Sequence, residues 1–227
     1  MESKVFSFKE IVEQVAELSI QANRKPESIQ ILPVSKGQKL ITVKDFLLEN
    51  PSVSCLGENY LEEMCGKQEA LKSFKKLSWH YLGRLQSRKI SEIAQGVDVI
   101  HSISRRKELE LLSKMELKES LQFYLQFNVS EEASKGGFRI DEASSIADLV
   151  EGFGLGERVL GLMTLVSPIK KVGEKIVEGE FAALCQIRDV VFPNKGLSMG
   201  MSSDFHLAIK HGATCLRLGS ILFGERQ

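Results

Sequence analysis

Residues 121–129, Leu-Gln-Phe-Tyr-Leu-Gln-Phe-Asn-Val, give the clearest secondary-structure signal in the 227-residue sequence. Their length and aromatic content are typical of a β-strand. A polar loop containing the adjacent Gly136 and Gly137 follows, and an amphipathic stretch covers residues 141–152. This order of apolar run, polar turn and amphipathic stretch is the repeating unit of α/β proteins.

The same unit recurs on both sides of this stretch. Apolar runs predict seven more strands, at residues 29–35, 53–56, 77–82, 97–102, 159–165, 197–199 and 214–218. Amphipathic patterns predict helices at residues 60–74, 105–115, 141–152, 174–190 and 203–211, and residues 86–89 open another. Apolar positions such as Phe8, Ile11 and Val15 predict an opening helix over residues 6–23.

Eight strands alternating with helices predict an α/β fold, a (β/α)₈ TIM barrel with an extra N-terminal helix. No linker divides the chain, so residues 1–227 are expected to form a single domain. An open doubly wound sheet is the alternative, but no G-x-G-x-x-G motif follows the first strand. Pro33 removes a hydrogen-bond donor from the first predicted strand, which allows a bulge there.

Composition excludes several classes of protein. The 30 Lys and Arg balance 30 Asp and Glu without a long basic block, which argues against nucleic acid as a partner. The N-terminal residues lack the apolar core of a signal peptide, and no apolar run approaches the roughly 20 residues of a membrane helix. The four cysteines have no metal-ligand spacing, so we expect reduced thiols in a cytoplasmic protein and no metal.

Lys36 follows the first predicted strand. Alternation along this strand places Leu32, Val34 and Lys36 on one face, so the amine would lie over the barrel mouth, where this fold carries its working residues. Partial desolvation favours the neutral amine, which can form a Schiff base with a carbonyl. Judged by position alone, a lysine that begins a solvated loop is the more common case.

Two more candidates follow the next two strands. Asn59 stands near the start of a predicted helix and is expected to cap it, a role that would still let it face a ligand. His80, in Trp79-His80-Tyr81-Leu82-Gly83, can stack on a flat ligand, although a histidine satisfied inside the barrel is more common.

The last two strands lead into turns that combine glycine with hydroxyl groups, at Gly200-Met201-Ser202 and Gly219-Ser220. Backbone N–H groups and hydroxyls at these two strand ends are typical of the phosphate site of such barrels. The alternatives are that Ser202 only caps its helix and that Gly219 only turns the chain. Alternation also directs Arg217 into the barrel, where it needs a ligand acceptor or an internal salt bridge.

An amine nucleophile, a phosphate cradle and an inward arginine together fit a phosphorylated aldehyde, and pyridoxal 5′-phosphate (PLP) is the main candidate. A phosphosugar aldolase is the competing hypothesis. Its Schiff-base lysine usually lies near a late-middle strand, whereas the sixth predicted strand has no lysine until Lys170.

At these residues the sequence resembles the YggS/PROSC family of pyridoxal phosphate homeostasis proteins. The resemblance spans nearly the whole chain and rests on the segments Val34-Ser35-Lys36, Gly57-Glu58-Asn59, Trp79 to Gly83 with Leu85-Gln86-Ser87, Asn128 to Phe138, Gly161 to Thr164, Leu197 to Ser202, and Arg217 to Arg226.

The resemblance implies a barrel of the alanine racemase N-terminal type with PLP bound to Lys36. It implies phosphate contacts from Ser202, Gly219 and Ser220, and an Arg217 that faces the pyridine nitrogen. Asn59 and His80 would line the site. Where the family usually has Thr-Lys-Pro after the lysine, this sequence has Gly37-Gln38-Lys39, Arg88 replaces a common Asn, and Ser220 replaces a frequent Thr.

The function that the resemblance favours is a cytoplasmic, monomeric protein that buffers PLP and hands it to apo-enzymes without catalytic turnover. A PLP-dependent amino-acid racemase is the alternative. Such enzymes need a second domain and a tyrosine base, and the sequence ends at Gln227, soon after the last predicted strand, with Tyr60 and Tyr81 near the mouth. A scaffold with an unused pocket is a third reading.

Overall fold

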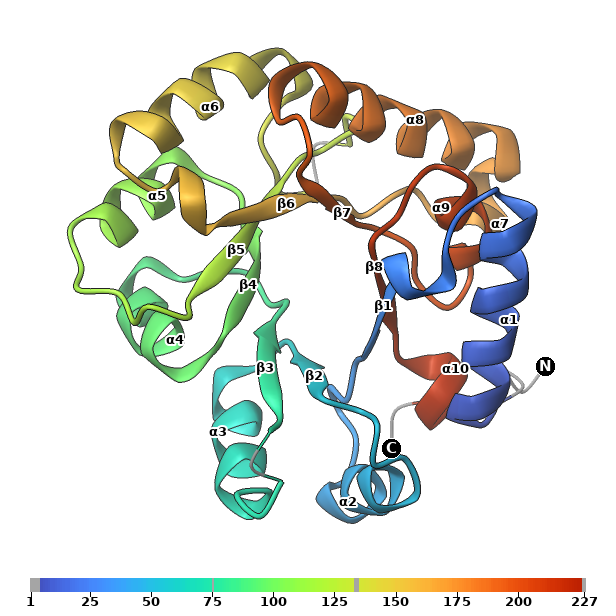
Figure 1. Cartoon of the computed structure of the whole chain (residues 1–227). Helices are drawn as coiled ribbons and strands as arrows, with labels where there is room; N and C mark the ends of the chain where they lie inside the picture. Colours follow the sequence, from blue (N-terminus) through green and yellow to red (C-terminus); the bar gives the residue numbers. More distant parts are fainter. Residues whose placement is uncertain (1–4, 75, 133–134, 226–227) are drawn as a thin grey trace.

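Eight parallel strands enclose a barrel in the computed structural model, which describes residues 5–74, 76–132 and 135–225 (Figure 1). Ala133, Ser134 and Arg226, from the segments quoted above, lie outside the described residues. The strands are β1 (Gln30–Pro33), β2 (Cys55–Glu58), β3 (Ser78–Tyr81), β4 (Val99–Ile103), β5 (Gln122–Gln126), β6 (Val159–Met163), β7 (Gly196–Ser198) and β8 (Cys215–Leu218). The first strand pairs with the last, so the (β/α)₈ barrel is confirmed and the open sheet is wrong.

Helices surround the strands on the outside (Figure 1). They are α1 (Phe8–Gln21), α2 (Leu40–Glu49), α3 (Leu61–Ala70), α4 (Ile90–Gly96), α5 (Arg106–Ser113), α6 (Ala143–Gly152), α7 (Ile169–Val172), α8 (Glu174–Val191), α9 (Phe205–Lys210) and α10 (Ser220–Phe223). Short 3-10 turns cover Pro26–Ser28, Ser87–Lys89, Ile140–Glu142 and Gly156–Arg158. In the part of the chain described, no helix has the length and apolar character needed to cross a membrane.

The predicted opening helix is confirmed as α1, and a capping box fixes its start. The Glu10 amide donates to Ser7 Oγ at 3.3 Å, and the Ser7 amide donates to Glu10 Oε2 at 2.8 Å. The sequence analysis missed α2 because its apolar residues do not share one face. Val43 and Leu47 are buried, whereas Ile41 is 61% exposed.

β1 and β2 stand at the two ends of the hydrogen-bonded strand order, and the barrel closes between them. These two strands meet at one isolated bridge, from Val34 just after β1 to Gly57 of β2. Pro33 is tolerated beside this seam. The Gln30 amide donates to the Thr214 carbonyl just before β8, and the Val34 amide donates to the Leu218 carbonyl of β8. The donor that Pro33 lacks would therefore face β2. β1 keeps a single register with β8 through Pro33, so the allowed bulge is not formed.

Side chains along the strands alternate between the barrel interior and the helix layer. Cys215 of β8 packs against Leu32 and Cys55 in a small interior cluster. Leu216 and Leu218 belong instead to the large core between strands and helices. The facing predicted for the last strand is therefore confirmed.

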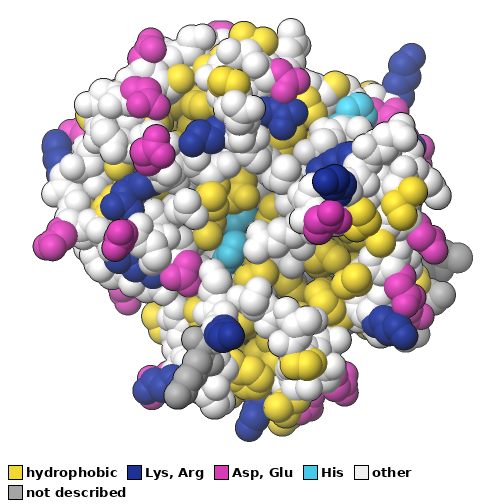
Figure 2. Space-filling model, viewed as in Figure 1, with side chains coloured by type: hydrophobic (Ala, Val, Ile, Leu, Met, Phe, Trp, Pro, Cys, Tyr) yellow, Lys and Arg dark blue, Asp and Glu magenta, His cyan; other side chains and the backbone are white. Residues whose placement is uncertain are grey.

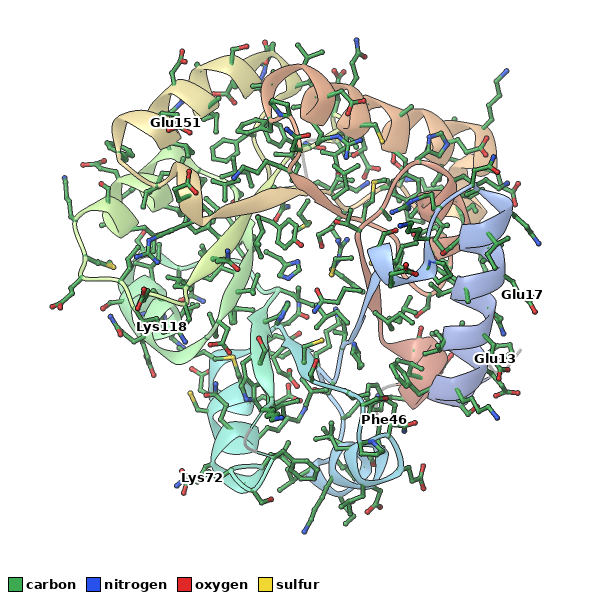
Figure 3. The ribbon with its side chains drawn as sticks, viewed as in Figure 1. Glu13, Glu17, Phe46, Lys72, Lys118 and Glu151 are labelled. Atoms are coloured by element: carbon green, nitrogen blue, oxygen red, sulfur yellow. The ribbon has the colours of Figure 1, made fainter. Side chains whose placement is uncertain are left out.

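Three phenylalanine rings hold the helix layer together beside the first strand. Phe46 of α2 is labelled in Figure 3. Its ring centroid lies 4.7 Å from that of Phe223 of α10 and 5.7 Å from that of Phe8 of α1. The amide of Phe6 donates to the Ile221 carbonyl at 2.9 Å, which ties the segment before α1 to α10. These contacts fix α10, which follows β8 directly.

Replacing Phe46 with alanine should lower the free energy of unfolding by roughly 2 kcal/mol, because the half-buried ring contacts two others and its removal leaves a cavity. Phe46→Leu should cost less than half as much. Urea denaturation followed by circular dichroism measures both values. Equal stability of Phe46→Ala and the parent protein would show that the three rings do not stabilise the fold.

Candidate functional site

A cavity of about 990 Å³ opens at the carboxyl ends of the strands. Six of the seven predicted site residues line it: Lys36, Asn59, Ser202, Arg217, Gly219 and Ser220. The seventh, His80, is buried in the barrel interior and is not among the lining residues. Figure 2 shows histidine side chains deep in the middle of the molecule, surrounded by hydrophobic ones.

Lys36 occupies the second position of a tight turn. The Gln38 amide donates to the Ser35 carbonyl at 3.1 Å, and Gly37 has φ 69°. A positive φ at the third position is the pattern of a type II turn, which favours glycine there. The departure Gly37-Gln38-Lys39 therefore places a glycine at the turn position that favours it, while Lys39 stands directly before the next helix. Lys36 itself is half-buried and borders the cavity.

Arg217 points into the barrel and is held by backbone and side-chain acceptors. Its Nη1 donates to the carbonyl and hydroxyl oxygens of Ser198 at 2.5 and 2.8 Å, and its Nη2 donates to the Thr164 carbonyl at 2.7 Å. Among the described residues no carboxylate lies within ion-pair distance of the guanidinium, so the internal salt bridge considered above is not formed. Burial lowers the pKa of Arg217.

A chain of hydrogen bonds connects Arg217 to His80 through the barrel interior. Ser198 Oγ lies 2.8 Å from His101 Nδ1, and His101 Nε2 lies 2.9 Å from His80 Nδ1. Burial lowers the pKa of His80 to about 4 and that of His101 well below its usual value, so both rings are neutral at pH 7. The structure thus connects His80 to the site indirectly, and direct contact with a ligand stays a prediction.

Asn59 does not cap the helix that follows it, so that expectation was wrong. The helix α3 begins at Leu61, and Tyr60 precedes it without a side-chain cap. The strand β2 runs two residues further than predicted, through Glu58, which carries Asn59 to the cavity wall. Its Oδ1 is buried and has no hydrogen-bond partner within the described chain, a state that a ligand donor would relieve.

The two predicted phosphate loops lie together at the cavity. Ser202 Oγ accepts from the Ile221 amide at 3.3 Å, and this bond joins the loop after β7 to the start of α10. Ser202 does not cap α9, because Asp204 stands directly before that helix. At Gly219 a Cβ would lie 3.1 Å from the Val34 carbonyl oxygen, so a side chain there would require a small shift of the backbone and glycine allows the close approach without one.

Sequence reasoning missed a buried ionic cluster behind Lys36. Lys67 of α3 lies 2.6 Å from Glu58 Oε1 and 2.7 Å from Glu63 Oε1. Lys67 and Glu58 are 4% and 0% exposed. One signal was available, because Lys67 shares the apolar face of its helix with Met64 and Leu71 at i, i+3 and i+7 spacing.

Comparison with known proteins agrees with this geometry. Residues 12–227 match the family model described as alanine racemase, N-terminal domain. The pyridoxal phosphate homeostasis protein of Pseudomonas aeruginosa is 34% identical over 222 residues, covering 95% of this chain and 93% of that protein. The structure of PipY from Synechococcus elongatus with PLP bound superposes with a TM-score of 0.69 at 27% identity, covering 93% of this chain and 100% of PipY.

Alanine racemases share the fold at lower identity. The enzyme from Acinetobacter baumannii gives a TM-score of 0.68 at 14% identity, and the match covers 96% of this chain but 59% of the racemase. The family model and the barrel define the class, the alanine racemase N-terminal type. Within that class, the chain belongs to the family of pyridoxal phosphate homeostasis proteins.

Replacing Gly37 with threonine should destabilise this protein by roughly 1–2 kcal/mol, because a β-branched residue is strained at φ 69°. Gly66→Ala is the matched control. Gly66 lies inside α3, and a Cβ added there would meet no other atom within 4 Å. Alanine at this position should therefore raise the free energy of unfolding by roughly 0.5–1 kcal/mol. Urea denaturation measures both. A stable Gly37→Thr variant would mean that the turn readily adopts another conformation.

Stability should fall as the pH is lowered from about 6.5 to about 4. In this window the unfolded chain protonates His80, whereas the folded protein, with a His80 pKa of about 4, resists protonation. The loss attributable to His80 is on the order of 3 kcal/mol. Replacing His80 with glutamine should make the free energy of unfolding less dependent on pH in this window. An unchanged slope would contradict the buried, neutral state of His80.

Proposed function

We propose that this protein binds PLP in the cavity, holds it as a Schiff base on Lys36, and keeps intracellular PLP in bound form without catalytic turnover. The observation that carries the proposal is the convergence of six predicted residues, drawn from the first two and the last two strands of the barrel and the loops after them, on one cavity. The family membership and the PLP-bound PipY structure support it.

The residues present fit the aldehyde and the phosphate of PLP. When bound, PLP supplies an aldehyde, and the Lys36 amine would condense with it and release water. Ser202, Ser220 and the backbone at Gly219 offer hydroxyl and N–H donors of the kind that bind phosphate. The unsatisfied Oδ1 of Asn59 marks a further place where a ligand would complete the cavity wall.

Arg217 would set the electronic state of the pyridine ring. A guanidinium only donates hydrogen bonds, so it would leave a facing ring nitrogen unprotonated and keep PLP a poor electron sink. The bonds from Arg217 to Ser198 and Thr164 fix its two terminal nitrogens and prevent it from turning away. This arrangement supports binding over turnover.

The positions of the tyrosines also favour a binding protein over a racemase. The sequence contains three, Tyr60, Tyr81 and Tyr124, and none is among the described residues that line the cavity. Tyr81 and Tyr124 are buried, and burial raises the pKa of both. A tyrosine base for proton transfer at the cavity would have to come from elsewhere.

Sequestration has a chemical purpose, because a free aldehyde reacts indiscriminately with cellular amines. In our proposal the protein acts in the cytoplasm as a monomer and releases PLP to apo-enzymes. Reversible condensation suits this role, since water regenerates the free aldehyde and the amine.

The direct test is borohydride trapping on Lys36. Purified protein mixed with PLP and reduced should carry a stable adduct on Lys36 in peptide mass spectra, and Lys36→Ala should carry none. Lys170→Ala is the matched control, because Lys170 also borders the cavity but should not be needed for the adduct. A total adduct yield in Lys36→Ala equal to that of the parent protein would refute the proposal.

A racemase assay on the same protein separates binding from catalysis. We expect no measurable interconversion of L- and D-alanine. Turnover that is lost in Tyr81→Phe would establish the racemase instead.

A further inference from the structure

We propose that Lys67, together with Glu58 and Glu63, is a positioning device that holds the turn carrying Lys36 from both sides. This inference rests on the proposed role of Lys36. Glu58 is the last residue of β2, and Glu63 and Lys67 belong to α3. None of the three is among the residues that line the cavity, so their effect on a ligand acts through Lys36.

The residue before Lys36 is fixed by the cluster at two atoms. The Lys67 ammonium donates to the Ser35 carbonyl at 2.6 Å, and Ser35 Oγ donates to Glu58 Oε1 at 2.6 Å. Ser35 is fully buried, and its amide donates to the Gly57 carbonyl at 3.0 Å. The amide, carbonyl and hydroxyl groups of Ser35 are therefore all hydrogen-bonded, which fixes the backbone on this side of Lys36.

The residue after Lys36 is fixed by the same cluster. The Gly37 amide donates to Glu63 Oε1 at 2.7 Å, and the same oxygen accepts from Lys67 at 2.7 Å. The Glu63 carboxylate thus connects the Gly37 amide to the Lys67 ammonium, which itself binds the Ser35 carbonyl. Both peptide neighbours of Lys36 are tied to a single buried side chain.

The location of the cluster explains why such a device is needed. The turn lies at the seam between β1 and β2, where one isolated bridge replaces a ladder. Elsewhere in the barrel, ladder hydrogen bonds would hold the end of a strand. Here the backbone of Ser35 bonds to Gly57 and Gln38, and the cluster adds side-chain bonds on both sides of Lys36.

The cost of the cluster indicates that it serves more than stability. Burial raises the pKa of Glu58, while hydrogen bonds from Lys67 and Ser35 lower it, and Glu58 Oε2 has no partner in the described chain. Buried ion pairs stabilise proteins no better than well-packed apolar residues of similar size. Position 67 lies between Met64 and Leu71 on the buried face, where leucine or methionine would pack.

The proposal predicts that position 67 controls how fast Lys36 captures an aldehyde. Lys67→Met should slow the appearance of Schiff-base absorbance after mixing with PLP by about tenfold or more, because misplacing a reacting group carries a cost of this kind. Lys67→Arg, which keeps the charge, should recover most of the rate. Lys72→Met is the matched control, because it removes an exposed ion pair with Glu69 just beyond the same helix.

Two further measurements separate positioning from general damage. The double variant Glu58→Gln, Lys67→Met removes both charges of the buried pair. It should capture PLP as slowly as Lys67→Met does, but its free energy of unfolding should be closer to that of wild type than that of Lys67→Met. Pyridoxine 5′-phosphate has the phosphate and ring but no aldehyde, so its dissociation constant reports the cavity alone and should change less than twofold in all variants. Equal losses of capture rate and of pyridoxine 5′-phosphate affinity would overturn the proposal.

Hydrogen exchange of the Gly37 amide tests the device without PLP. In the Glu58→Gln, Lys67→Met protein this amide should exchange about tenfold faster or more, because the carboxylate that accepts it has lost its buried partner. If Lys36 is not the PLP residue, wild-type protein will lack the trapped adduct while exchange at Gly37 still responds to position 67. If the positioning device is wrong, the adduct will form and both the capture rate and the exchange will match wild type.

Discussion

The pairing of β1 with β8 is the contact on which the rest of the molecule depends. It sets Leu32 beside Arg217 and Pro33 beside Leu218, and the Val34 amide donates to the Leu218 carbonyl at 2.8 Å. This register brings a lysine from the first strand and a glycine turn from the last strand to the same edge of the barrel. A shift of one residue would turn Arg217 out of the barrel and move Gly219 away from the Val34 carbonyl.

Much of this arrangement follows from local sequence pattern. Period-two alternation in residues 215–218 predicts which side chains enter the barrel, and glycines beside serines at two strand ends predict the phosphate loops. These features can be predicted from the sequence because each depends on a few consecutive residues. The helix α2 was missed because Ile41 and Leu48 break its pattern with exposed apolar side chains.

The remaining features depend on contacts between distant residues. Sequence spacing cannot show that Lys67 reaches the Ser35 carbonyl, because that bond requires α3 to pack against β2 next to the segment that follows β1. The shift of β2 by two residues has the same origin. Asn59 looked like a helix cap, but pairing with β3 extends β2 through Glu58 and brings Asn59 to the cavity wall.

The closing of the barrel by its first and last strands also has a consequence for how the protein acquires its ligand. A ribosome makes β1 early and β8 late, and contacts so distant in sequence form slowly because a long loop must be closed. The half of the cavity that holds Lys36 therefore exists in the nascent chain without the half that holds Ser220. A ligand that bridges both halves binds the closed barrel and not the open chain, so it shifts the folding equilibrium by mass action. A ligand of this kind would therefore stabilise the contact between β1 and β8 even though it need not touch the paired backbone itself.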